Sequence, residues 1–260
     1  ARRPTRPISR NGSSGTAPYY YARSGALSAV SASSGSLSNG SFTASQFTAG
    51  EANISLTPLF TFTNKLTSAT AVTIRATDSD AVSSSSGTDG SLSVRSGRIK
   101  VSNAFGSEKA SLSVPVQTQY WNGKAWVVNS QDSCTSIPAA SVARSNYVDN
   151  KGASTAAWST TPSAVAIVSG NGTLTLSAPG GGYTGSVDFA FNLGTSTTDQ
   201  SCLSNHPSST GASLAWLRAQ NGTNASCAGV VTYDRDPSAR ATFGVYQPES
   251  RKSVYQRELY

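Results

Sequence analysis

Residues 111–128, SLSVPVQTQYWNGKAWVV, decide the fold of this chain. Apolar and polar side chains alternate along the first part, as they do in a strand that buries one face. The apolar positions of this part are Leu112, Val114, Val116 and Tyr120. The dipeptide Asn122-Gly123 follows and predicts a hairpin, because a type I′ turn needs positive φ at both central residues. Pro115 cannot donate a ladder hydrogen bond, so the sequence predicts an edge or bulged strand here.

Runs of the same period lie on both sides of this hairpin, separated by turn residues. They contain Phe60 and Phe62, Val72 and Ile74, then Ile99, Val101 and Phe105, then Val187, Phe189, Phe191 and Leu193, and finally Phe243 and Val245. Residues 135–170 carry no clear pattern, with Tyr147 and Trp158 as candidate core residues. No apolar stripe has helical spacing, so no helix is assigned. We predict an all-β fold: an antiparallel β-sandwich, immunoglobulin-like or jelly-roll-like, as one sandwich or two packed together.

The first 18 residues form a basic segment that cannot build a core, because Ile8 is their one large aliphatic side chain. Their cations are Arg2, Arg3, Arg6 and Arg10. We predict three parts: an extended basic arm over 1–18, an N-terminal β region over 19–95 and a C-terminal β-sandwich domain over 96–260. Such an arm needs a neighbouring subunit to hold it, which favours assembly.

The net charge of +7 is concentrated near the two ends of the chain. No nucleic-acid-binding motif accompanies this charge, so we predict no nucleic-acid partner. The sequence contains no apolar run long enough to cross a bilayer and no signal-peptide core. We expect an extracellular or cell-surface protein, exported with its leader removed and without a transmembrane segment.

The three cysteines, Cys134, Cys202 and Cys227, have spacings that match no metal motif. In an exported protein the odd count predicts one disulfide and one further thiol. We prefer a bridge between Cys202 and Cys227, which closes a short excursion rich in Ser, Gly and Asn. The other two pairings remain open.

Catalytic and metal-binding patterns are weak. A serine-hydrolase triad would depend on His206, the single histidine, which lies in a Ser-rich stretch. No nucleophile elbow, phosphate loop or dinucleotide fingerprint occurs, so we predict no enzyme and no cofactor, with an unrecognised hydrolase as the remaining alternative. Two acidic groups lack the spacing of a calcium loop and are read as turn formers. They are Asp78, Asp80 and Asp89, and the pair Asp234 and Asp236.

Aromatic residues point to carbohydrate binding as the main alternative function. Tyr19, Tyr20, Tyr21, Trp121 and Trp126 are candidate platforms for stacking on sugar rings. The competing interpretation is packing within the core and across strands. Charged residues are interleaved in the C-terminal stretch, which predicts an edge strand that includes Tyr255, Arg257, Leu259 and Tyr260.

Three stretches carry a resemblance to a known family: residues 97–134 with the strings NAFGSE and YWNG, residues 175–189, and residues 236–260 with RATFG. They resemble the C-terminal region of MshQ-like proteins, surface proteins associated with MSHA-type type IV pili. The resemblance extends over roughly 72–133, 172–193 and 234–260. It implies a β-rich extracellular domain linked to pilus biogenesis or adhesion, without catalytic or cofactor residues. The chain departs from the family in being far shorter and in starting with a basic arm.

We therefore expect a structural or adhesive protein that assembles through its N-terminal arm or its edge strands. The partners would be identical subunits or other pilus and surface proteins. The alternative is a monomeric carbohydrate-binding adhesin module that recognises host or environmental glycans.

Overall fold

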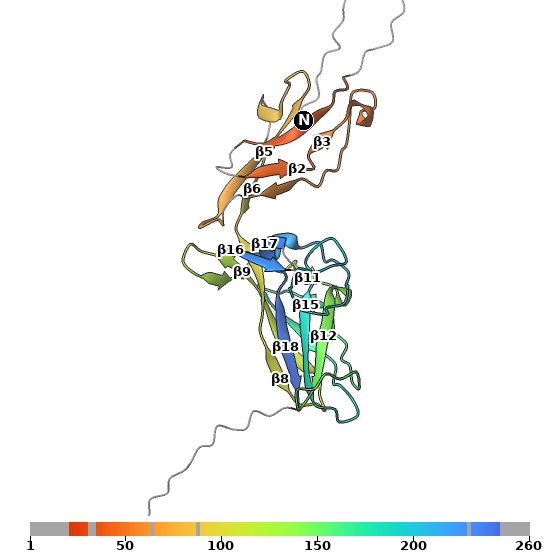
Figure 1. Ribbon diagram of the computed structural model, residues 1–260. Coiled ribbons are helices and arrows are strands. Elements are labelled where there is room, and N and C mark those ends of the chain that lie inside the picture. Colours follow the sequence, from red (N-terminus) through yellow and green to blue (C-terminus); the bar gives the residue numbers. More distant parts are fainter. Residues whose placement is uncertain (1–20, 31–34, 63–64, 87–88, 228–229, 245–260) are drawn as a thin grey trace, which may run out of the picture. The chain divides into compact units, whose positions relative to one another are not determined.

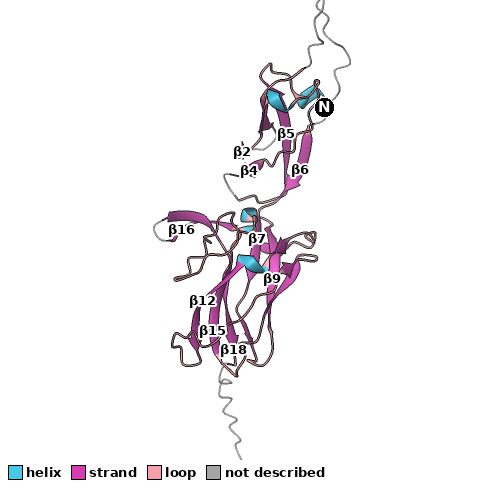
Figure 2. Cartoon of the chain, turned by 90° about the vertical axis from the view of Figure 1, so that its right-hand side faces the viewer, coloured by secondary structure: helices cyan, strands magenta, loops and turns pink. Residues whose placement is uncertain are grey.

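The chain divides into two compact units in a computed structural model, Ala1–Arg95 and Ser96–Tyr260. The structure describes residues 21–30, 35–62, 65–86, 89–227 and 230–244, and of residues 219–234 it describes the backbone alone. Within these residues it contains strands and short 3₁₀ turns but no α-helix (Figure 2). The all-β prediction is confirmed.

Unit 1 is built around a four-stranded antiparallel sheet in the order β3-β1-β5-β6. These strands are β1 (Gly25–Ala29), β3 (Ser41–Phe42), β5 (Thr70–Asp78) and β6 (Gly90–Val94). A separate pair joins β2 (Ser36–Ser38) to β4 (Leu59–Thr61). Val72 is the buried side chain of β5, and the rings of Phe60 and Phe62 pack edge to face 4.7 Å apart.

Unit 2 consists of two sheets that share one core. The first sheet contains β7 (Gly97–Val101), β9 (Leu112–Trp121), β10 (Trp126–Val128) and β14 (Asn171–Leu176). The second has the order β12-β15-β18-β8, visible side by side in Figure 1, with β8 (Ala104–Gly106), β12 (Val142–Asp149), β15 (Gly185–Phe191) and β18 (Ser238–Phe243). Fully buried side chains of both sheets meet between them, among them Val114, Leu174 and Phe189. This packing matches the predicted β-sandwich.

Two short pairs and four 3₁₀ turns complete the described structure. The pairs are β11 (Ser136–Ile137) with β13 (Val165–Ala166), and β16 (Ala219–Cys227) with β17 (Val230–Arg235). The turns are η1 (Ala44–Gln46), η2 (Ser84–Ser86), η3 (Ala139–Ser141) and η4 (Ala215–Leu217).

Strand β9 is central and pairs without a register shift, which corrects the prediction of an edge or bulged strand at Pro115. It pairs with β14 and β10 along one side and with β7 along the other. The backbone N–H of Trp121 donates to the carbonyl of Ser96, on the β7 side of β9. Backbone N–H groups point to alternate sides along a strand, so the nitrogen of Pro115, six positions earlier, also faces the β7 side. Pairing with β7 ends at Val116. The missing N–H of Pro115 therefore costs no ladder bond.

The turn after β9 also differs from the prediction. Gly123 has a φ of 95°, whereas Asn122 does not have positive φ, so the turn is not type I′. The Asn122 side-chain oxygen accepts hydrogen bonds from the amides of Lys124 and Ala125, and Trp121 pairs with Trp126. The loop thus spans four residues and is closed by an asparagine side chain.

Two further expectations were wrong in detail. Ile99 and Val101 face the core as predicted, but Phe105 is 63% exposed, because the chain passes to the other sheet and β8 buries Ala104 instead. Residues 142–149, where no pattern was seen, form β12. A bulge between Ser145 and Val148 interrupts its alternation, which explains why the strand was missed.

Candidate functional site

Many predicted site residues lie outside the described part of the structure. These are Arg2, Arg3, Arg6, Ile8, Arg10, Tyr19, Tyr20, Tyr255, Arg257, Leu259 and Tyr260. The side chain of Cys227 is also outside it, so the bridge to Cys202 stays a prediction. Tyr21 belongs to unit 1, where its ring packs 6.2 Å from that of Phe47. The candidate stacking aromatics are therefore divided between the two units.

Trp121 and Trp126 lie side by side on β9 and β10. They are directly paired across the strands, and their rings pack edge to face with centroids 5.6 Å apart. The guanidinium of Arg98, on β7, lies 4.5 Å from the centre of the Trp126 ring, within cation–π range. Both rings are half-buried. The pair thus combines the two predicted roles, cross-strand packing and a partly open aromatic surface.

A row of amide side chains continues from Arg98 across the sheet, on the face opposite the core. Arg98 Nε donates to Gln119 Oε1 at 2.9 Å, and Gln119 Nε2 donates to Gln117 Oε1 at 3.1 Å. Gln117 Nε2 then donates to Asn171 Oδ1, on β14, at 3.2 Å. We call Arg98, Gln117, Gln119, Asn171, Trp121 and Trp126 the tryptophan–amide face. Each amide in the row has one further donor hydrogen and one further lone pair.

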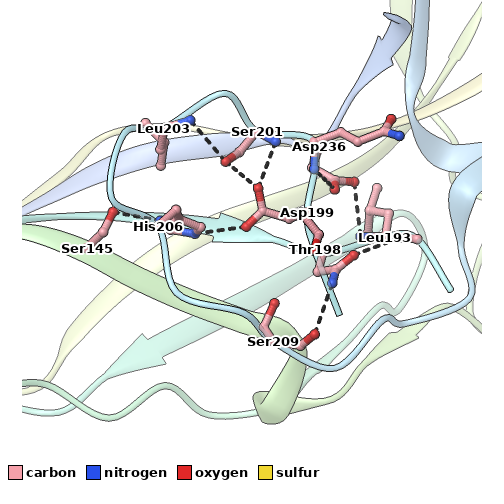
Figure 3. Close-up of polar contacts among 12 residues, drawn as sticks. Ser145, Leu193, Thr198, Asp199, Ser201, Leu203, His206, Ser209 and Asp236 are labelled. Carbon is pink, nitrogen blue, oxygen red and sulfur yellow. Dashed lines mark hydrogen bonds and ion pairs between the residues drawn. The ribbon is translucent and has the colours of Figure 1, made fainter. Parts of the chain in front are cut away.

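A second cluster, drawn in Figure 3, brings a serine, a histidine and an aspartate together. Ser145 Oγ lies 2.6 Å from His206 Nδ1, and His206 Nε2 lies 3.2 Å from Asp199 Oδ2. The second contact has the distance of an ion pair but is not aligned as a hydrogen bond. A neutral ring with its proton on Nε2 directs that proton toward the carboxylate and leaves Nδ1 to accept from the Ser145 hydroxyl.

Comparison with known protein families gives one match for this chain. Residues 95–259 match the fourth domain of DUF6701. The chain belongs to the DUF6701 family. The match covers unit 2 except its last residue, Tyr260, and of unit 1 it includes Arg95 alone. No curated protein and no solved structure matches the chain.

The serine–histidine–aspartate cluster of this DUF6701 domain is closed to solvent. Ser145 is 5% exposed, and the side chains of His206 and Asp199 are 5% and 6% exposed. Burial lowers the pKa of His206 below its ordinary value of 6.5, against the opposing charges of Asp199 and Asp188. A nucleophilic serine has to reach its substrate. The cluster in this conformation instead fixes the loop that carries His206 to strand β12.

The same loop of the DUF6701 domain is anchored a second time through Asp236. Its carboxylate accepts two hydrogen bonds from the Arg218 guanidinium, at 2.7 and 2.9 Å, and one from the amide of Gln200. It accepts a further hydrogen bond from the amide of Leu193 (Figure 3). Asp199 accepts from the amide and the hydroxyl of Ser201 within the loop. From the sequence, Asp236 was interpreted as a turn former, and its buried ion pair with Arg218 was not predicted.

Asp78, Asp80 and Asp89 have structural partners, with Asp80 paired to Arg23, whereas the side chain of Asp234 lies outside the described part of the structure. Asp78 caps a turn by accepting from the amides of Asp80 and Val82, and Asp89 pairs with Arg75 and Ser84. The hydrogen bonds from Arg75 and Ser84 hold the pKa of Asp89 below its ordinary value. In the part of the chain that the structure describes, no group of His, Cys, Asp and Glu has the arrangement of a metal site. No helix within that part has the length and apolar character needed to span a membrane.

Proposed function

We propose that this chain is an extracellular structural and adhesive protein without enzymatic activity. The sequence resemblance to MshQ-like proteins supports a role in pilus-associated adhesion at the bacterial surface. The paired sheets of unit 2 offer backbone edges through which identical subunits can join. Function would then depend on assembly and attachment, with no chemical step.

The open edge of β8 is the observation that carries this proposal. β8 pairs in parallel with β18 on one side, and among the described residues no strand pairs with its other side. Phe105 projects from this edge into solvent. Segment 253–260 of a second copy, which is predicted from the sequence to be a strand with interleaved charged residues, could add here. Phe105 would supply an apolar contact for its tyrosines and leucine.

Assembly is tested by light scattering and electron microscopy of the full chain beside three variants. We expect polymers from the parent chain, and their loss on removal of residues 253–260 or on Phe105→Arg. Val168→Arg changes an equally exposed residue in the turn before β14 and should leave assembly intact. A parent chain that stays monomeric at high concentration would refute the proposal.

Glycan binding is the second candidate function, and the tryptophan–amide face favours it. Sugar rings present C–H groups that pack on aromatic faces, and hydroxyls that both donate and accept hydrogen bonds. Trp121 and Trp126 match the first property, and the amides of Gln117 and Asn171 match the second. Binding to a panel of immobilised glycans tests this function. Trp126→Ala should abolish binding, whereas Tyr183→Ala, an exposed aromatic in another loop, should not.

A further inference from the structure

The sheet that carries the tryptophan–amide face contains no acidic residue. The sequences of β7, β9, β10 and β14 include neither Asp nor Glu. Lys100 lies on the same face as Arg98, because the two are opposite Gln117 and Gln119 in register, and it is exposed. The loop between β9 and β10, next to Trp121 and Trp126, carries the exposed Lys124. The four strands therefore contribute two cations, Arg98 and Lys100, and no carboxylate to this face.

The nearest acidic residue along the chain after this hairpin turns away from solvent. Asp132 is 8% exposed, and its carboxylate accepts hydrogen bonds from the hydroxyl and amide of Thr135. Arg98 itself is constrained, since it donates to Gln119 and stacks on Trp126. Burial lowers the pKa of its guanidinium, which is the direction expected for a cation that lacks a carboxylate partner.

We infer that the tryptophan–amide face binds an acidic polysaccharide, one that carries carboxylate or sulfate groups along its chain. The inference rests on the glycan binding proposed above and names its substrate class. Sugar rings pack on Trp121 and Trp126, and their hydroxyls bond the amides of Gln117 and Asn171. The anionic groups pair with Lys100 and Lys124. The row from β7 to β14 crosses two strand spacings, about 10 Å, which gives an extended polymer several contacts.

A nucleic acid is also anionic, and its flat bases could stack on the two tryptophans. Its phosphate groups only accept hydrogen bonds, so base edges alone would have to supply donors to the spare acceptor positions of Gln117 and Asn171. Sugar hydroxyls satisfy both the donors and the acceptors of an amide. This difference favours a polysaccharide.

The test uses the full chain and three polymers: polygalacturonate, alginate and a sulfated galactan. Each is offered beside its neutral counterpart, carboxyl-reduced or desulfated, with a single-stranded oligonucleotide as a further probe. We expect binding to at least one acidic polymer, weaker by about tenfold or more for its neutral form, and weakened by salt. Lys100→Gln with Lys124→Gln should reduce affinity about fivefold, as expected for two exposed ionic contacts. Lys109→Gln with Lys151→Gln removes the same charge from exposed lysines elsewhere in unit 2 and should have no effect.

The outcomes separate this inference from the function on which it rests. Equal binding of neutral and acidic forms, lost in Trp126→Ala, would retain glycan binding and overturn the acidic specificity. Equal losses in the two lysine pairs would show attraction to net charge and overturn the site. Tighter binding of the oligonucleotide would overturn the polysaccharide assignment. Failure of every polymer in both forms would overturn glycan binding as well.

Discussion

The Nδ1 atom of His206 lies 2.6 Å from the hydroxyl oxygen of Ser145, a residue on strand β12 and 61 positions earlier in the chain. This contact joins a long loop to the edge strand of the second sheet. His206 is also the single histidine of the protein. Its titration can therefore be followed without interference from another imidazole.

Stability is expected to fall as the pH drops below 6.5. Burial lowers the pKa of His206 in the folded state, so the unfolded chain takes up a proton first. The stabilising contribution is complete above the ordinary value of 6.5 and is lost as the pH falls toward the lower, folded-state pKa. Urea unfolding between pH 5 and pH 8 measures it. His206→Asn should flatten this dependence; an unchanged slope in that variant would contradict the assignment.

Removal of the Asp236 carboxylate should be strongly destabilising. Asp236→Ala leaves the Arg218 cation without its buried partner and deprives two backbone amides of their acceptor. The expected loss of unfolding free energy is about 3–5 kcal/mol. The control is Asp80→Ala, which breaks the exposed pair with Arg23 and should cost about 1 kcal/mol or less. Similar losses in both variants, measured by denaturant unfolding, would contradict this account.

Two glycines with positive φ are expected to respond differently to alanine. Gly170 has a φ of +78°, and an added Cβ would lie 2.5 Å from the Asn129 carbonyl oxygen. Gly152 has a φ of +83°, but an added Cβ would meet no atom within 4 Å. Gly152→Ala should therefore cost about 1 kcal/mol, from backbone strain alone. Gly170→Ala should cost clearly more in thermal or urea unfolding, and equal costs would show that the close contact is unimportant.

The three cysteines should differ in reactivity. Cys134 is exposed and is a free thiol, so a maleimide should label it in the native protein. Our predicted bridge leaves Cys202 and Cys227 unreactive until a reductant is added. Peptide mass spectrometry under non-reducing conditions tests the pairing. Labelling of Cys202 in the native, unreduced protein would rule out the bridge.

Strict alternation made much of the fold predictable. In β9 and β15 the apolar positions repeat every second residue, and Val114, Val116, Phe189 and Phe191 are buried as expected. The bulge after Ser145 hid β12, because an extra residue moves the following side chains to the other face. Phe105 was misplaced because the sequence does not mark where the chain changes sheet.

The polar clusters were harder to predict than the strands. Ser145, Asp199 and His206 are brought together by tertiary packing, and no short motif links them. The same is true of Asp236 and Arg218. The Trp121–Trp126 pair was accessible to sequence reasoning because a single hairpin holds both residues. Gln117 and Gln119 were overlooked, although their period of two in β9 signals a shared face.

Strand β18 is the last to be made in the described part of the chain, yet it lies inside its sheet, between β15 and β8. Until Phe243 has been synthesised, β8 has no partner there and β15 has one bare edge. In a nascent chain the position between β15 and β8 is therefore empty, and a strand of suitable pattern from a neighbouring copy can occupy it. Because β18 is synthesised after the other strands of its sheet, the sheet stays incomplete until β18 has been made. Insertion of the chain's own β18 therefore competes with insertion of a strand from a neighbouring molecule.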